Sequence, residues 1–194
     1  MSDSLQEKSE PERKEKAKNE MWDWIRSIAI ALLLALLIRE YMFAIFMVDG
    51  ESMIPTLQDH ERLVVNKLIY HIHKPQDGEI IIFKYPADPS KDFVKRVMAT
   101  PGETIEVKNN KVYRNGQPLD ERYLVEPTLG HFGPVTVPPG HVFAMGDNRN
   151  YSKDSRDPSV GFVPYDNIVG RADLVIWPFN KFNLFPYQVK GETK

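Results

Sequence analysis

The sequence of 194 residues contains no cysteine, which excludes disulfide bonds, thiolate metal sites and a cysteine nucleophile. It also has no basic surplus, because its 25 Lys and Arg are balanced by 27 Asp and Glu. Proteins that bind nucleic acid normally carry such a surplus, so we expect no nucleic-acid partner. No internal repeat is present, and the length suits one domain plus a small additional segment.

Long apolar runs are absent except near the N-terminus, where residues 28–38 are all apolar. This run alone is too short for a bilayer, but residues 21–43 form a helix of about 34 Å, enough to cross one with some tilt. Arg26 and Arg39 can reach the two interfaces, and aromatic residues suited to an interfacial belt flank the run. We therefore expect a transmembrane anchor over residues 21–43.

Residues 1–20 are polar and cannot bury a core, so we expect this tail to be disordered or a frayed helix. Its mixed charge and the lack of an A-x-A site disfavour a cleaved signal, and its polarity disfavours a buried soluble helix. Lys and Arg cluster before the anchor and are sparse just after it. The positive-inside rule then predicts a cytoplasmic tail and an extracytoplasmic domain over residues 44–194.

Beyond the anchor, the apolar runs are short and rich in Val, Ile, Phe and Tyr, which is typical of strands. Strands are expected within residues 41–48, 62–70, 78–86, 92–99, 103–119, 135–148 and 168–179. Asn109-Asn110 and Asn115-Gly116 predict tight turns. The predicted fold class is mainly β, an antiparallel-sheet domain preceded by one transmembrane helix.

Ser52 lies in "VDGESMIPTL", directly after an apolar strand candidate. Taken alone, it can be an ordinary turn residue or a helix N-cap. Gly50 permits a close approach of backbone or ligand, and Pro55 stiffens the segment that follows. A nucleophilic serine is the alternative interpretation.

Lys95 lies in "DFVKRVMATPGE", where alternation along a strand would place Phe93, Lys95 and Val97 on one face. The lysine can extend its amine to water from a half-exposed strand. Alternatively, it is desolvated, and burial then lowers the pKa of the amine by several units from about 10.4. Such a lysine can accept the proton of a serine hydroxyl.

A third segment, "GDNRNYSKDSRDPSVGF", is either a solvated loop or the support of an active site. Asp147 and Asp154 can each pair with Arg149 or Arg156, and such pairs hold a loop in one shape. Ser152 or Ser155 could then point inward and orient the amine. The five histidines stand in no catalytic pattern. His71 and His73, on one face of a strand candidate, leave only a weak metal site open.

Together, the anchor and "GESMIPTL", "FVKRVMATPGE" and "GDNRNYSKDSRD" resemble the bacterial type I signal peptidases, in a short form with a single anchor. The resemblance extends from the anchor to about Pro178. It implies that Ser52 is the nucleophile and Lys95 the general base. It further implies that Ser152 hydrogen-bonds and orients the lysine and that Asp154 supports the loop.

The resemblance assigns roles to further residues. Asp147 and Arg156 match a structural ion pair, and Met53 and Arg96 flank the catalytic residues. The expected substrate-binding residues are Phe46, Val48, Met53, Leu57 and Val94. In some members of the family, a serine that donates to the oxyanion stands where this chain has Gly50. Here the oxyanion is expected to be bound by the Ser52 backbone N–H and a further donor near Gly50. Asn150 and Tyr151 also vary from common versions of the third motif.

The function implied is removal of signal peptides from exported preproteins at the membrane surface, with no metal or other cofactor. Preproteins and the lipid bilayer are the expected partners; the oligomeric state stays open. Rival interpretations are a membrane-anchored β scaffold and a processing peptidase with one dedicated substrate. A self-cleaving regulator would need a DNA-binding domain and a cleavable hinge, and the sequence shows neither.

Overall fold

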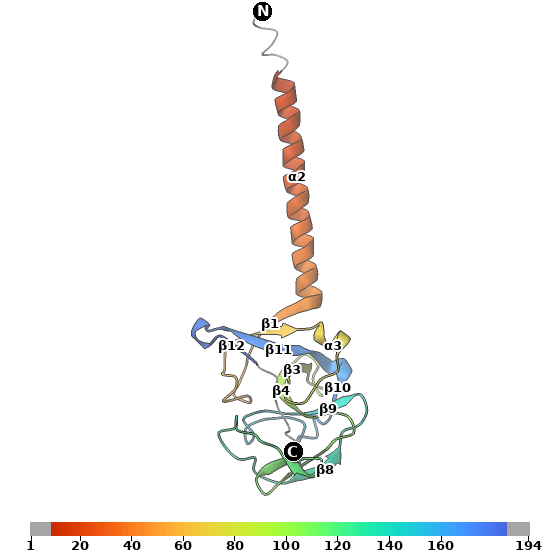
Figure 1. Ribbon diagram of the computed structural model, residues 1–194, viewed down its shortest axis with the longest axis vertical. Coiled ribbons are helices and arrows are strands. Elements are labelled where there is room, and N and C mark those ends of the chain that lie inside the picture. The colour runs from red at the N-terminus through yellow and green to blue at the C-terminus, as the bar shows by residue number, and fades with distance from the viewer. Residues whose placement is uncertain (1–8, 186–194) are drawn as a thin grey trace, which may run out of the picture. The chain divides into compact units, whose positions relative to one another are not determined.

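The computed structural model describes residues 9–185. It divides into a helical unit, which ends at Met42, and a β unit, which begins at Phe43. The helical unit consists of α2 (Ser9–Leu37) and one π-helical turn, η1 (Ile38–Met42), drawn in red and orange in Figure 1.

Helix α2 is continuous because nothing in its interior breaks it. Its proline, Pro11, lies in the first turn, where a backbone N–H has no helical partner to lose. The segment Glu15–Met42 is long and apolar enough to cross a membrane, with a mean hydropathy of 1.9. Its apolar side chains are exposed on all sides, which suits an apolar solvent rather than water.

The predicted anchor and the helix differ at both ends. Residues 9–20, expected to be disordered or a frayed helix, belong to α2, while residues 1–8 lie outside the described part. At the other end, Phe43 is already the first residue of a strand. Leu, Ala, Glu and Lys are strong helix formers, which explains why the polar segment continues the apolar helix.

The β unit contains two antiparallel sheets. The larger has the order β1-β2-β11-β3-β4-β9-β10, with β12 also paired to β11, and the smaller has the order β7-β6-β5-β8. The larger sheet comprises β1 (Phe43–Met47), β2 (Arg62–Asn66), β3 (Ile80–Lys84), β4 (Asp92–Ala99), β9 (His141–Met145), β10 (Val163–Pro164), β11 (Ile168–Trp177) and β12 (Asn183–Leu184). The smaller comprises β5 (Thr104–Lys108), β6 (Lys111–Arg114), β7 (Gln117–Pro118) and β8 (Phe132–Thr136). Short helices are α3 (Ile69–Ile72), η2 (Tyr165–Asn167) and η3 (Phe179–Lys181).

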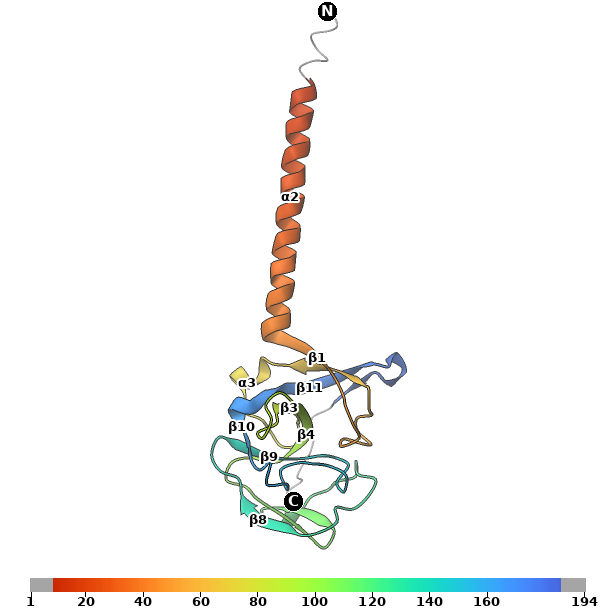
Figure 2. The ribbon, with the colours of Figure 1, turned by 180° about the vertical axis from the view of Figure 1, so that it is seen from behind.

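Strand β3 is buried on both faces, which explains its uninterrupted apolar sequence. Ile80 and Ile82 belong to one core cluster, and Ile81 and Phe83 belong to a second. Figures 1 and 2 show β3 and β4 inside the unit, between β11 and β9, with β8 of the smaller sheet beyond β9. Strand β4 therefore runs beside a strand whose first four residues are fully buried.

The predicted mainly antiparallel β class is confirmed, and each strand-rich segment contains a strand. The turn at Asn109-Asn110 is also confirmed, since both residues have positive φ, 49° and 59°. The strand prediction for residues 69–70 was wrong, because the chain turns after β2 and they belong to helix α3; the Ile69 N–H donates to Asn66 Oδ1 at 3.2 Å. His71 and His73 therefore do not share a strand face.

The two-sided burial of β3 generates a prediction for stability. Replacing Ile82, which is fully buried, by Ala should lower the free energy of unfolding by about 2–5 kcal/mol because it leaves a cavity. The matched control is Ile72→Ala, at a position 76% exposed, which should change it by less than about 0.5 kcal/mol. Urea unfolding of the detergent-solubilised protein measures both. Equal losses in the two variants would contradict the assignment of β3 to the core.

Candidate active site

Three segments meet at one place: the turn after β1, strand β4, and the loop after β9. The turn after β1 is closed at its base by hydrogen bonds from Val48 N to Glu61 O (2.8 Å) and from His60 N to Val48 O (2.9 Å). Strand β4 pairs with β9, with Arg96 opposite Met145, so the loop that follows β9 emerges beside Arg96. A direct bond joins the loop to the turn, because Asn148 N donates to Ser52 O at 3.0 Å.

Lys95 and Ser52 are in direct contact. The Lys95 Nζ donates a hydrogen bond to Ser52 Oγ at 2.7 Å and another to Val94 O at 2.9 Å. Lys95 is only 3% exposed, so its amine does not extend into water from a half-exposed strand. This geometry joins a hydroxyl and an amine that are 43 residues apart in the sequence.

The surroundings of the amine disfavour its charged form. Burial lowers the pKa of Lys95 from 10.5 to about 8, and the carboxylates of Asp154 and Asp147 oppose this by favouring the ammonium. The Phe93 ring lies beside the amine, with its centroid 5.2 Å from Nζ. Alternation along β4 predicted that Phe93, Lys95 and Val97 share a face, and Phe93 and Val97 do lie in one core cluster.

The backbone around Ser52 is shaped by Gly50, whose φ of +95° is rare for any residue with a side chain. The Gly50 N–H is already engaged, since it donates to Asp59 Oδ1 at 2.8 Å, and this bond lowers the pKa of Asp59. A further oxyanion donor near Gly50 is therefore not the N–H of Gly50 itself. The Ser52 N–H remains a candidate, because no partner for it is found in residues 9–185.

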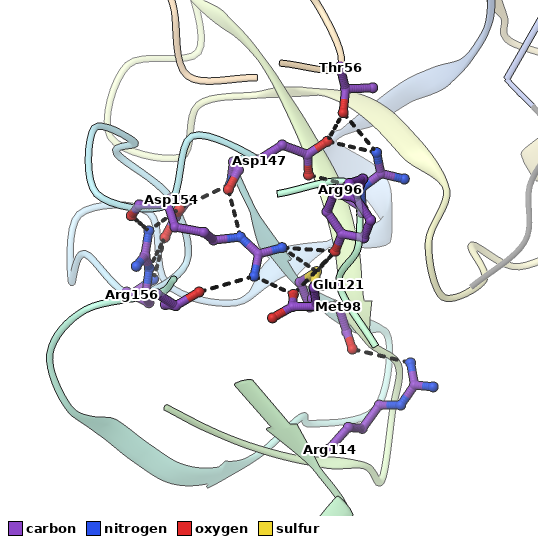
Figure 3. A network of polar contacts seen from close by, with 12 residues as sticks. Thr56, Arg96, Met98, Arg114, Glu121, Asp147, Asp154 and Arg156 are labelled. Atoms are coloured by element: carbon purple, nitrogen blue, oxygen red, sulfur yellow. Dashed lines mark hydrogen bonds and ion pairs between the residues drawn. The ribbon is translucent and has the colours of Figure 1, made fainter. Parts of the chain in front are cut away.

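Asp147 joins all three segments (Figure 3). Its carboxylate receives two hydrogen bonds from the neighbour of Lys95, Arg96 Nε at 2.9 Å and Nη2 at 2.6 Å. It also accepts a hydrogen bond from Thr56 Oγ1 at 2.6 Å, on the turn that carries Ser52. The predicted ion pair between Asp147 and Arg156 is wrong, because β4 brings Arg96 closer, and sequence spacing alone does not reveal which strand lies beside the loop.

Arg156 pairs instead with Asp154, one of the pairings that the loop sequence left open. The Arg156 Nε and Nη2 donate to the two oxygens of Asp154 at 2.8 and 2.7 Å. Asp154 also accepts from Gly146 N at 3.0 Å, and Arg156 Nη2 donates to Arg149 O at 2.6 Å. These bonds close the loop on itself, as expected of a supporting role for Asp154.

Arg149 is a buried member of the loop, which the sequence left open as a partner of Asp147 or Asp154 but which pairs with Glu121 instead. Its Nε donates to Gly146 O at 2.9 Å, its Nη1 pairs with Glu121, and its Nη2 donates to Tyr123 OH at 2.9 Å. Burial raises the pKa of Tyr123, so this phenol stays neutral. Glu121 and Tyr123 had no sequence signal, because they lie in an irregular segment between β7 and β8 and join the site only through the fold.

The two candidate serines of the loop have different surroundings. Ser155 is part of the scaffold, since its Oγ accepts a hydrogen bond from Ala144 N at 3.0 Å. The Ser152 Oγ is buried and has no hydrogen-bond partner among the described residues, so the expected hydrogen bond from Lys95 is not formed. Ser152 is nevertheless close to the site, because a Cβ placed on Gly146 would lie 2.2 Å from Ser152 Oγ and 2.4 Å from Ser52 O.

The expected substrate-binding residues form or border one apolar cluster in the same part of the β unit as Ser52 and Lys95. Val48, Met53 and Leu57 are buried in it, while Phe46 and Val94 pack against it and remain partly exposed. Only Phe46 and Val94 therefore offer appreciable surface, and the other three support it from below. Strand β1 carries Phe46. Among the described residues, it is an edge strand of the larger sheet.

No group of three or more His, Cys, Asp or Glu arranged to hold a metal ion occurs within residues 9–185. His71 and His73, the weak candidates from the sequence, are exposed on and next to α3.

Comparisons with known proteins place these features in one family. The profile of the family described as "Signal peptidase, peptidase S26" matches residues 21–177. Signal peptidase I of Bacillus amyloliquefaciens is 42% identical over 191 residues, 93% of this chain and 97% of that protein. The probable signal peptidase I-1 of Synechocystis is 44% identical over 172 residues, 83% of this chain and 87% of that protein.

Among solved structures, a signal peptidase I from Enterococcus faecalis is 35% identical, with a TM-score of 0.46, and covers 52% of this chain and 97% of that one. The identities over most of the chain, together with the profile match, show the family directly. The chain belongs to the bacterial type I signal peptidases, which are hydrolases of the peptidase S26 family.

Proposed function

We propose that this protein removes signal peptides from exported preproteins with Ser52 as nucleophile and Lys95 as general base. The observation that carries the proposal is the 2.7 Å contact between Lys95 Nζ and Ser52 Oγ at a lysine only 3% exposed. A nucleophile and a base within hydrogen-bond reach are the minimum that this chemistry requires. The family supports the substrate class, since the relatives are named signal peptidases.

The reaction begins with the neutral amine. A distance of 2.7 Å serves a hydrogen bond in either direction, so the uncharged Lys95 accepts the Ser52 hydroxyl proton as Oγ attacks the scissile carbonyl. The resulting ammonium then protonates the leaving amine, and the C–N bond breaks to leave an acyl-enzyme. Lys95, neutral again, takes a proton from water as the water attacks the ester, and then gives this proton to Ser52 Oγ as the C–O bond breaks and the new carboxyl terminus leaves. No metal or other cofactor enters these steps.

The oxyanion of each tetrahedral intermediate needs preorganised donors. We assign one donor to the Ser52 backbone N–H. A second donor comes from the segment beside Gly50, excluding the Gly50 N–H that Asp59 holds.

Ser152 would hold the neutral amine in place. The neutral Lys95 amine has two N–H donors, and its lone pair receives the Ser52 proton. One N–H donates a hydrogen bond to Val94 O. A change of the Ser152 side-chain rotamer that carries its buried, unpartnered Oγ toward the amine would let it accept the other. An unsatisfied buried hydroxyl costs about 1–3 kcal/mol, which favours that rotation when the amine is neutral.

The substrate would add as an extended strand along the edge strand β1, where main-chain hydrogen bonds give affinity without sequence preference. Small side chains before the cleaved bond would fit against Phe46 and Val94, above the buried Val48, Met53 and Leu57. The helix Glu15–Met42 would anchor the protein in the bilayer that also holds the signal peptide. Confinement to one surface raises the frequency of their encounters.

The dyad predicts the outcome of two substitutions. Ser52→Ala and Lys95→Met should each lower kcat/KM for a preprotein by at least about 10³-fold, because either change removes the whole proton-transfer unit. Ser90→Ala and Lys74→Met, at exposed positions, are the matched controls and should retain activity. Wild-type turnover in either dyad variant would disprove the assignment. Circular dichroism checks that all four variants are folded.

The lowered pKa of Lys95 predicts the pH dependence of cleavage. The reactive species is the neutral amine, so kcat/KM should rise with pH through about 8 and reach a plateau above it. Below this pKa the neutral fraction, and with it the rate, should fall about tenfold per pH unit. We call this pH-dependent rise the limb of the profile. A limb centred near pH 10.5, the ordinary pKa of lysine, would instead show a solvated amine.

The absence of cysteine allows a direct test of orientation in the membrane. In intact cells, a membrane-impermeant maleimide should label the variant Lys74→Cys, whose residue is exposed in the β unit. It should label Lys16→Cys only after the membrane is permeabilised, because the positive-inside rule places that residue in the cytoplasm. The reverse pattern would show the opposite orientation, and labelling of both in intact cells would show that the helix does not span.

A further inference from the structure

A second lysine of the catalytic loop is connected to Lys95 through two stacked rings. The Lys153 Nζ lies over the Tyr85 ring, 4.9 Å from its centroid. Tyr85 and Phe93 are stacked, with centroids 4.6 Å apart and ring planes 8° from parallel. The Lys95 Nζ lies over the Phe93 ring at 5.2 Å. Two amines thus bracket one aromatic pair.

The stack is held in place by the loop. The Tyr85 hydroxyl donates to Ser159 Oγ at 2.9 Å, and Ser159 Oγ donates to Asp157 Oδ1 at 2.6 Å. Tyr85 is only 8% exposed, although Lys153 above it is exposed to solvent. The Tyr85 ring over which Lys153 lies is therefore held in place by burial and by its hydrogen bond.

The charges of the two amines affect each other through the stacked rings. The face of an aromatic ring is negative and attracts a cation, so Phe93 by itself would stabilise the protonated form of Lys95. A permanent cation over Tyr85 attracts the electrons of the same stack and repels a second cation nearby. Both effects disfavour the ammonium of Lys95 and favour the neutral amine that catalysis needs.

The charged groups around each lysine support this division of roles. Tyr85 and Asp157 face Lys153, and the Tyr85 hydroxyl raises the pKa of Lys153, so Lys153 stays charged wherever the enzyme is active. Asp154 and Asp147 face Lys95 and favour its ammonium. A nearby positive charge opposes the influence of these two carboxylates.

We propose that Lys153 is a positioning residue for the Ser–Lys reaction: its charge, held over the Tyr85–Phe93 stack, raises the fraction of the Lys95 amine that is neutral near neutral pH. The inference rests on the proposed function of Lys95, but it assigns a role to a residue outside the dyad. It is a long-range effect on the general base and requires no contact between Lys153 and the substrate.

The test is kcat/KM against pH for Lys153→Met, Lys153→Glu and Lys153→Arg. The limb near 8 should move up by roughly half a pH unit in the Met variant and about one unit in the Glu variant, since the second change doubles the lost charge. At pH 7 the activity should fall about 3-fold and about 10-fold, respectively, while the plateau at high pH stays unchanged. Lys153→Arg, which keeps the charge, should leave the limb in place.

Three controls distinguish this electrostatic role from a general effect on activity. Lys111→Met removes an exposed lysine from the smaller sheet and should leave the limb unmoved. In the wild type, 1 M salt should shift the limb as Lys153→Met does, because it reduces the Debye length to about 3 Å. In Lys153→Met itself, salt should shift the limb little. Tyr85→Leu interrupts the stack. In this background, Lys153→Met should shift the pH limb by less than it does in the wild type.

An unmoved limb in both Lys153→Met and Lys153→Glu would overturn the proposal, as would an equal shift in Lys111→Met. A fall of the plateau with no movement of the limb would also overturn it, since that would show a purely structural role. These results would leave the dyad standing, whereas its failure would appear separately as full activity in Lys95→Met.

Discussion

Removal of the Lys95 amine from water is the constraint on which the site depends. Lowering the pKa of Lys95 from 10.5 to about 8 corresponds to about 3 kcal/mol against the charged form, a cost that the folded protein must offset. Strand β4 makes this possible because it pairs with β3, whose residues are buried on both faces. The aromatic side chain of Phe93 then covers the amine, and the contact with Ser52 gives it the one partner that the reaction requires.

Buried ion pairs hold together the three segments of the candidate site: the turn after β1, strand β4 and the loop after β9. Asp147 bonds to Arg96, the neighbour of Lys95 on β4, and to Thr56 on the turn that carries Ser52, so one carboxylate fixes the separation of strand and turn. The pair of Asp154 and Arg156 closes the loop on which this carboxylate stands. Breaking a buried pair leaves an uncompensated charge that costs about 3–5 kcal/mol, so the loop has little freedom to move away from the dyad.

Much of the β unit could be predicted from the sequence, because its strands are short runs of β-branched and aromatic residues and its turns carry Asn and Gly. The family resemblance brought together Ser52 and Lys95, and the alternation of β4 predicted the apolar face of the lysine. The partner of Asp147 could not be predicted, since local spacing does not show which strand lies beside the loop. For the same reason, Glu121 and its bond to Arg149, 28 residues away, had no local signal.

The state of the amine can be observed directly, without substrate. With lysines labelled at the Cε carbon, NMR spectra of the detergent-solubilised protein recorded against pH follow the protonation of each amine, and the signal lost in Lys95→Arg identifies Lys95. We predict that this signal titrates with a midpoint near 8, well below the ordinary value for a solvated lysine, about 10.4. A midpoint for Lys95 near that ordinary value would contradict the central claim, because Ser52 would then have no neutral base at its side.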